Sequence, residues 1–92
     1  MIYLFIYQSN LGLFRSSDPL IREIKAFPGW AQCLDGTWLI ATHDDLVTVN
    51  QILRQHLNDD DLSLLVPIEI EYQGWLPNEI WDWITNSRDS GF

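Results

Sequence analysis

Hydrophobic and polar residues follow one another along the chain in short blocks that predict strands and helices. Residues 2–8 are apolar on both faces and rich in β-branched and aromatic side chains, which is typical of a strand inside a sheet. Residues 30–34 and 37–42 are two apolar blocks separated by Asp35-Gly36, a pair that favours a hairpin with a type I′ turn. Residues 64–72 alternate between apolar and polar, and Pro67 among them favours a strand at the sheet edge.

Three other segments have the spacing of amphipathic helices. The first begins at Asp18-Pro19, an N-cap residue followed by a proline, and ends before Pro28-Gly29. The second follows the capping sequence of residues 42–45 and keeps apolar residues on one stripe until Asn58. The third begins at Pro77 and carries several tryptophans.

This order of elements predicts an α+β domain with the ferredoxin-like βαββαβ antiparallel sheet and an added short C-terminal helix. We expect one domain over residues 1–92, with the βαββαβ core at 1–72, a Trp-rich helix within 73–85 and a frayed tail at 86–92. In that fold the first and third strands are central and the fourth lies at an edge. The helices of the core are expected to cover one face of the sheet and to leave the other open.

Composition excludes several classes of protein. The chain has 92 residues, of which 47% are hydrophobic and 13% aromatic, and this is too apolar for a disordered protein. The single cysteine, Cys33, leaves no partner for an intramolecular disulfide and is expected to be a small hydrophobic residue within a strand. No apolar run approaches the ~18 residues of a membrane span, and nothing resembles a signal peptide. We therefore expect a cytoplasmic protein that does not enter a membrane.

Charge is uneven along the chain. The net charge is −8; residues 1–58 hold four basic and five acidic residues, and residues 59–92 hold one basic and eight acidic residues. An acidic C-terminal third repels nucleic acid and attracts a protein with a basic surface, although it is also what solubility alone requires. We expect no nucleic-acid partner.

The open face of the sheet suggests a homodimer. If the aliphatic side chains of the first strand meet the helices, the aromatic ones lie on the open face, where they need a partner copy or the C-terminal helix to cover them. Stacking of nucleobases on these rings is disfavoured by the neighbouring Glu69 and Glu71. The loop of residues 8–17 adds an arginine beside apolar residues, either as an interface or packed on its own core. The residues expected at an interface are Tyr3, Phe5, Tyr7, Phe14, Arg15, Ile68, Ile70, Trp75 and Trp81.

Catalytic chemistry has few candidates. His43 is followed by Asp44 and Asp45, a group that fits an acid/base or metal site, yet both acids are explained by capping of the second helix. The catalytic candidates are Asn10 and His43. No metal-binding motif, phosphate-binding loop or dinucleotide fingerprint occurs, and we expect no cofactor.

Three blocks of sequence resemble a known group of proteins: the first strand ending in Ile6-Tyr7, residues 34–40 (LDGTWLI) and residues 74–84 (GWLPNEIWDWI). They are similar to short uncharacterised bacterial and phage proteins of the SinR family, whose pattern is similar to the CRISPR-associated ferredoxin-like nucleases of spacer acquisition. In those nucleases an aspartate at the end of the first strand holds a metal between two protomers, and this position is Gln8 here. A neutral amide is a poor ligand for a hard divalent ion.

The resemblance therefore implies the dimer more than the nuclease. We expect a non-catalytic homodimeric interaction module with an acidic face, binding a protein partner in an inhibitor, immunity or mobile-element role. A metal-dependent nuclease is the alternative.

Overall fold

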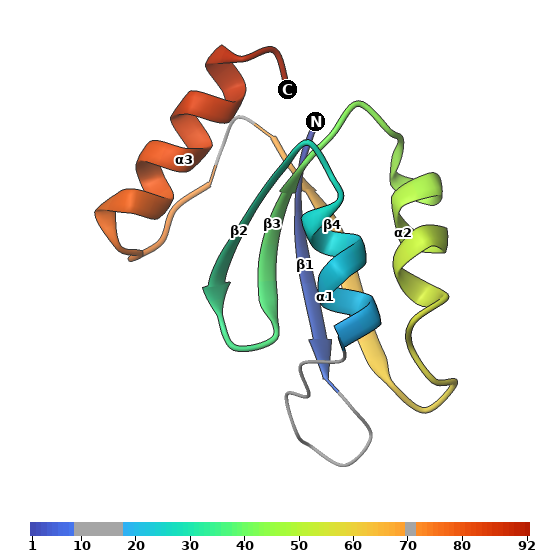
Figure 1. Cartoon of the computed structure of the whole chain (residues 1–92). Coiled ribbons are helices and arrows are strands. Elements are labelled where there is room, and N and C mark those ends of the chain that lie inside the picture. Colours follow the sequence, from blue (N-terminus) through green and yellow to red (C-terminus); the bar gives the residue numbers. More distant parts are fainter. Residues whose placement is uncertain (9–17, 70–71) are drawn as a thin grey trace.

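The computed structural model describes residues 1–8, 18–69 and 72–92 and is a small α+β structure with a four-stranded antiparallel sheet and three helices (Figure 1). Its elements, in chain order, are β1 (Ile2–Gln8), α1 (Asp18–Lys25), β2 (Gly29–Leu34), β3 (Thr37–Ala41), α2 (Leu46–Arg54), β4 (Leu62–Ile68) and α3 (Asn78–Asp89).

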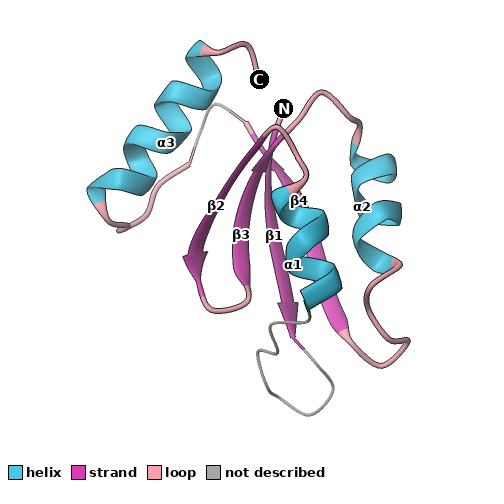
Figure 2. Ribbon diagram, in the orientation of Figure 1, coloured by secondary structure: helices cyan, strands magenta, loops and turns pink. Residues whose placement is uncertain are grey.

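The strands lie in the order β2-β3-β1-β4, so that β1 and β3 are central and β2 and β4 form the edges (Figure 2). β1 pairs along almost its whole length with both neighbours: Leu4 lies opposite Leu39 of β3 and Val66 of β4. The prediction that the doubly apolar segment is central and that the Pro67 strand is at an edge is confirmed.

The hairpin between β2 and β3 turns at Asp35-Gly36, as predicted, but the turn type differs. Gly36 has a φ of 69°, whereas no residue other than glycine within the described ranges has a positive φ. A type I′ turn requires positive φ at both central residues, so that prediction is wrong. The pairing register shifts between Gln32 and Leu34, which accommodates the turn by an irregularity in β2.

α1 and α2 pack on one face of the sheet, here called the inner face; in Figure 1, α1 lies in front of the sheet and α2 lies beside it, at the right. Their buried residues include Leu20 and Ile24 of α1 and Val49 and Leu53 of α2. α2 begins at Leu46 because Asp45 caps it: the Asp45 carboxylate accepts the Thr48 N–H at 2.8 Å.

α3 packs on the opposite face, here called the outer face, which the core helices leave open and which the sequence analysis expected a partner copy or the C-terminal helix to cover. Ile80 and Ile84 are buried against Ile2, Leu39 and Ala41. Gly29 makes this approach possible, since a Cβ there would lie 3.4 Å from the Trp83 ring and only 2.9 Å from the Ala41 side chain. α3 covers the part of the outer face nearest to β2 and the start of β1.

The ends of several elements also differ from the predictions. α2 ends at Arg54 rather than Asn58, because the N–H groups of His56 and Leu57 bond three residues back, to the carbonyls of Leu53 and Arg54, and tighten the chain into a turn. β4 begins at Leu62, two residues earlier than predicted, since Leu62 and Ser63 pair with the end of β1.

α3 continues to Asp89, beyond residue 85, where the Trp-rich helix is predicted to end. The Arg88 side chain bonds to the end of β4, and the Phe92 ring stacks on His43 at 4.7 Å between centroids. The tail is therefore attached to the rest of the molecule at two places.

Candidate docking surface

The aromatic stripe of the first strand faces inward rather than outward. Tyr3, Phe5 and Tyr7 are buried on the inner face under α1 and α2, and the rings of Phe5 and Tyr7 stack at 5.5 Å. Their prediction as interface residues is wrong, because the same chain covers them. The two helices present aliphatic side chains that fill the space between the aromatic rings of β1, so the inner face accommodates these larger side chains.

The tail tryptophans divide into two groups. Trp81 and Trp83 pack against the outer-face cluster of their own chain, and the Trp81 ring stacks on Tyr72 at 6.1 Å. Trp75, between β4 and α3, is 99% exposed. Covering of the sheet by the tail thus takes place within one chain, and Trp75 takes no part in it.

Other predicted site residues are either engaged structurally or not described. Asn10, Phe14, Arg15 and Ile70 lie outside the described residues. The acids after His43 hold the start of α2: Asp45 is its N-cap, which lowers the pKa of this carboxyl, and Asp44 accepts a hydrogen bond from the Thr42 hydroxyl. Across the described ranges, no three His, Cys, Asp or Glu side chains come together as a metal site.

A patch of aliphatic side chains remains exposed on the outer face beyond α3. It consists of Ile6 of β1 and three residues of β4, with exposed fractions of 39% for Ile6, 67% for Leu62, 57% for Leu64 and 38% for Val66. We call these residues the outer patch. Ile6 lies directly opposite Leu64, and the three β4 residues alternate along the strand, so all four side chains project from the same face.

The sequence analysis expected interface residues on the strand that carries most of the outer patch, but at other positions along it. The alternation of residues 64–72 identified the solvent-facing strand, and Ile68 was named as an interface residue. The structure packs Ile68 against the outer-face cluster instead, next to α3. Leu62 is not among the predicted interface residues because the strand is predicted to start at residue 64. Ile6 is not among them because the aliphatic side chains of the first strand, rather than its aromatic ones, are predicted to meet the helices.

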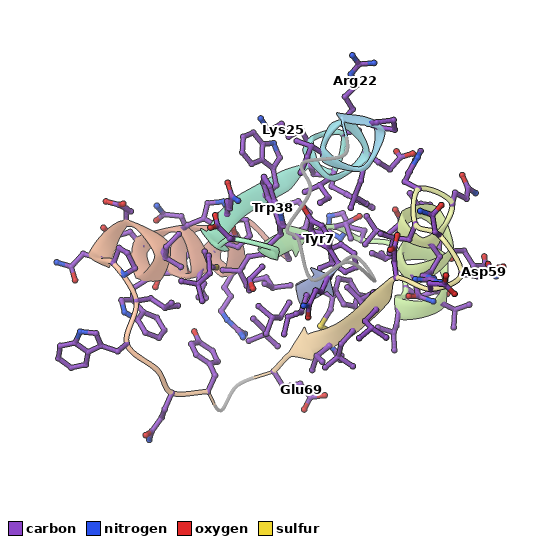
Figure 3. The ribbon with its side chains drawn as sticks, turned by 90° about the horizontal axis from the view of Figure 1, so that it is seen from below. Tyr7, Arg22, Lys25, Trp38, Asp59 and Glu69 are labelled. Atoms are coloured by element: carbon purple, nitrogen blue, oxygen red, sulfur yellow. The ribbon has the colours of Figure 1, made fainter. Side chains whose placement is uncertain are left out.

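Acidic residues lie next to both ends of β4. The turn of Asp59, Asp60 and Asp61 leads into the strand and Glu69 follows it; Figure 3 shows Asp59 and Glu69 at opposite ends of the strand. Two arginines are also present, but their guanidinium groups bond to the protein. Arg54 donates to the carbonyls of Asn58 and Asp61, and Arg88 to those of Ile68 and Glu69.

A second feature is a pocket of about 340 Å³ on the inner side, between α1 and β2. Its lining includes Tyr7, Lys25 and Trp38, which are labelled in Figure 3. Burial raises the pKa of the Tyr7 hydroxyl; the Trp38 side chain acts in the opposite direction, and Asp35 adds to the rise. The Lys25 ammonium lies 5.0 Å from the centre of the Trp30 ring. Among the described residues that line the pocket are one cation, Lys25, and one carboxylate, Asp35.

Comparison of the chain with protein-family models, curated proteins and solved structures found no match. In residues 1–8, 18–69 and 72–92, no helix has both the length and the apolar character that crossing a membrane takes.

Proposed function

We propose that the chain is a non-catalytic protein-interaction module of the ferredoxin-like type, and that the outer patch is its docking surface. The observation that carries the proposal is the set of four neighbouring aliphatic side chains that α3 leaves exposed on one sheet face. A contiguous exposed apolar patch is typical of a protein-interaction site. The central positions of β1 and β3 support the ferredoxin-like assignment.

The charges next to the patch favour a partner with a basic surface. Carboxylates lie near both ends of β4, and the arginines there already donate to backbone carbonyls. Such a module fits an inhibitor, immunity or mobile-element role against a basic protein, where complementary charge accelerates association and rejects other partners.

The sequence analysis also raised a homodimer and, as an alternative function, a metal-dependent nuclease. The homodimer stays a prediction, and the buried aromatic stripe of Tyr3, Phe5 and Tyr7 is not available as its interface. We do not propose the nuclease alternative. At the end of β1 the exposed Gln8 pairs with Leu62 and offers a neutral amide where a hard metal ion takes an anionic oxygen.

The test is affinity capture from a lysate of the source cells with three immobilised forms of the protein. Leu64→Glu places a charge in the centre of the outer patch. Val47→Glu is the matched control, since Val47 is 63% exposed but lies on α2. We expect one set of proteins to be retained by the wild type and the control and lost with Leu64→Glu. Equal capture by all three forms would contradict the proposal.

A further inference from the structure

Besides the carboxylates near its ends, β4 offers the docking surface the polar groups of its own backbone. The Tyr7 N–H donates to the Gly36 carbonyl at 2.9 Å, on the β3 side of β1. Because backbone groups of successive residues point to alternate edges of a strand, the odd residues of β1 face β3 and the even ones face β4. The even residues of β1 lie opposite the even residues of β4. The odd residues of β4 therefore turn their backbone groups to the free edge.

The residues of β4 whose backbone groups face the free edge are Ser63, Leu65 and Pro67. The N–H and C=O groups of Ser63 and Leu65 face outward, and among the described residues no other strand pairs with that side of β4. Pro67 has no N–H to offer, which suits an edge position. Beyond it, the Glu69 carbonyl accepts from Arg88. The edge is thus closed from Pro67 onward and open at Ser63 and Leu65.

The open part of the edge coincides with the outer patch. Leu62, Leu64 and Val66 flank the two open residues, and their side chains stand on the outer face next to the same edge. A strand added here would gain backbone hydrogen bonds from Ser63 and Leu65 and would lay every second side chain beside the exposed aliphatic residues.

In the register centred on Leu64, a second copy of this chain fits the edge poorly. If two β4 strands paired in antiparallel fashion about Leu64, Asp59 of each copy would lie opposite Glu69 of the other, and Asp61 opposite Pro67. Like charges directly opposite one another destabilise strand pairs, and acidic residues and proline are devices by which proteins prevent pairing of edges.

We infer that the docking surface takes an extended segment of a partner protein as a fifth strand on β4, with alternating apolar residues and with Lys or Arg at its C-terminal end. This rests on the proposed function and adds the chemistry of the partner. In an antiparallel arrangement the C-terminal end of the added strand lies beside the turn of Asp59, Asp60 and Asp61, where its basic residues meet carboxylates.

The test uses two synthetic peptides of alternating valine and threonine, one ending in lysines and the other in glutamates, and measures binding by fluorescence anisotropy. We expect the lysine peptide to bind the full chain roughly tenfold more tightly than the glutamate peptide. Ser63→Pro removes one outward N–H and should weaken binding by roughly tenfold, whereas Ser63→Ala keeps that N–H and should bind like the wild type.

Hydrogen exchange provides a measurement that does not depend on the folding of a variant. On binding of the lysine peptide, the amides of Ser63 and Leu65 should exchange more slowly. Absence of peptide binding, unchanged exchange at these amides, or equal affinity for the two peptides would overturn the inference.

The outcomes also separate this inference from the proposed function. If Leu64→Glu abolishes peptide binding and Ser63→Pro leaves it intact, strand addition is wrong and the docking surface stands. If neither substitution changes binding, both are wrong. A dimer of the wild type by light scattering that becomes a monomer with Leu64→Glu would make a second copy the occupant and overturn the inference, while the docking surface would stand.

Discussion

The Arg88 guanidinium donates to the backbone carbonyl oxygen of Ile68 at 3.3 Å, and this contact joins the last helix to the last strand. The same group bonds to the Glu69 carbonyl and lies 5.3 Å from the centre of the Tyr72 ring. Arg88 thereby holds α3 against the outer face and fixes how much of that face stays exposed.

Arg88→Ala should lower the free energy of unfolding by about 1–2 kcal/mol, because two carbonyl groups lose a charged donor. Urea unfolding followed by tryptophan fluorescence measures the loss, since Trp81 and Trp83 lie on α3. Arg22→Ala is the control: Arg22 is exposed on α1, and its loss should cost less than about 0.5 kcal/mol. Equal effects of the two substitutions would show that Arg88 does not anchor the helix.

Gly29→Ala should destabilise the protein by about 1–3 kcal/mol, because the added methyl group would lie 2.9 Å from the Ala41 side chain and crowd the Trp83 ring. Gly74→Ala is a matched control, since its new Cβ would lie 3.9 Å from Trp81, an ordinary contact. Thermal unfolding of both variants tests the packing of α3 on the outer face. A Gly29→Ala protein as stable as Gly74→Ala would contradict it.

Tyr3→Phe should cost about 1 kcal/mol, because the buried Tyr3 hydroxyl donates to the Asp44 carbonyl at 2.8 Å and the phenylalanine ring leaves this carbonyl without that donor. Burial, together with the charges of Asp45 and Asp44, raises the pKa of this hydroxyl, in keeping with a protonated donor. Tyr72→Phe, at a half-exposed ring, should change stability little. Chemical denaturation compares the two, and a Tyr3→Phe variant of wild-type stability would refute the role of this bond.

Asp45 should make the stability of the protein depend on acid pH. Its hydrogen bonds with Thr48 lower the pKa of its carboxyl from the ordinary 3.8, so its contribution is present above pH 3.8 and is lost as the pH falls through the lowered value. Asp45→Asn keeps an N-cap acceptor that does not titrate, so part of the acid-induced loss should disappear. Urea midpoints at neutral and acid pH measure this, with the exposed Asp82→Asn as control; identical pH profiles for Asp45→Asn and the wild type would rule the effect out.

Local sequence patterns were sufficient to predict those features of the fold that depend on residues close together in the chain. The segment from Ile2 to Gln8 could be read as a central strand because both of its faces are apolar. Asp35-Gly36 marked the hairpin, because glycine alone takes the positive φ of the turn at low cost. Pro67 marked the edge strand, because its missing N–H is tolerated only where no neighbour needs it.

Tertiary packing decided which face of β1 is which. A strand with aliphatic residues on one side and aromatic residues on the other has two apolar faces, and its sequence does not state which of them the helices cover. The structure places the rings of Tyr3, Phe5 and Tyr7 under α1 and α2, and this moves Ile6 to the exposed side.

The sequence by itself determined the order of the strands and helices and the acidic C-terminal third, because propensity, periodicity and charge are properties of short segments. Only the tertiary structure decided that α3 folds back on the outer face, since that depends on the space above Gly29 and on the reach of Arg88 to the end of β4. The outer patch is what this packing leaves uncovered. Its position follows from contacts between residues far apart in the chain, which no local pattern of residues contains.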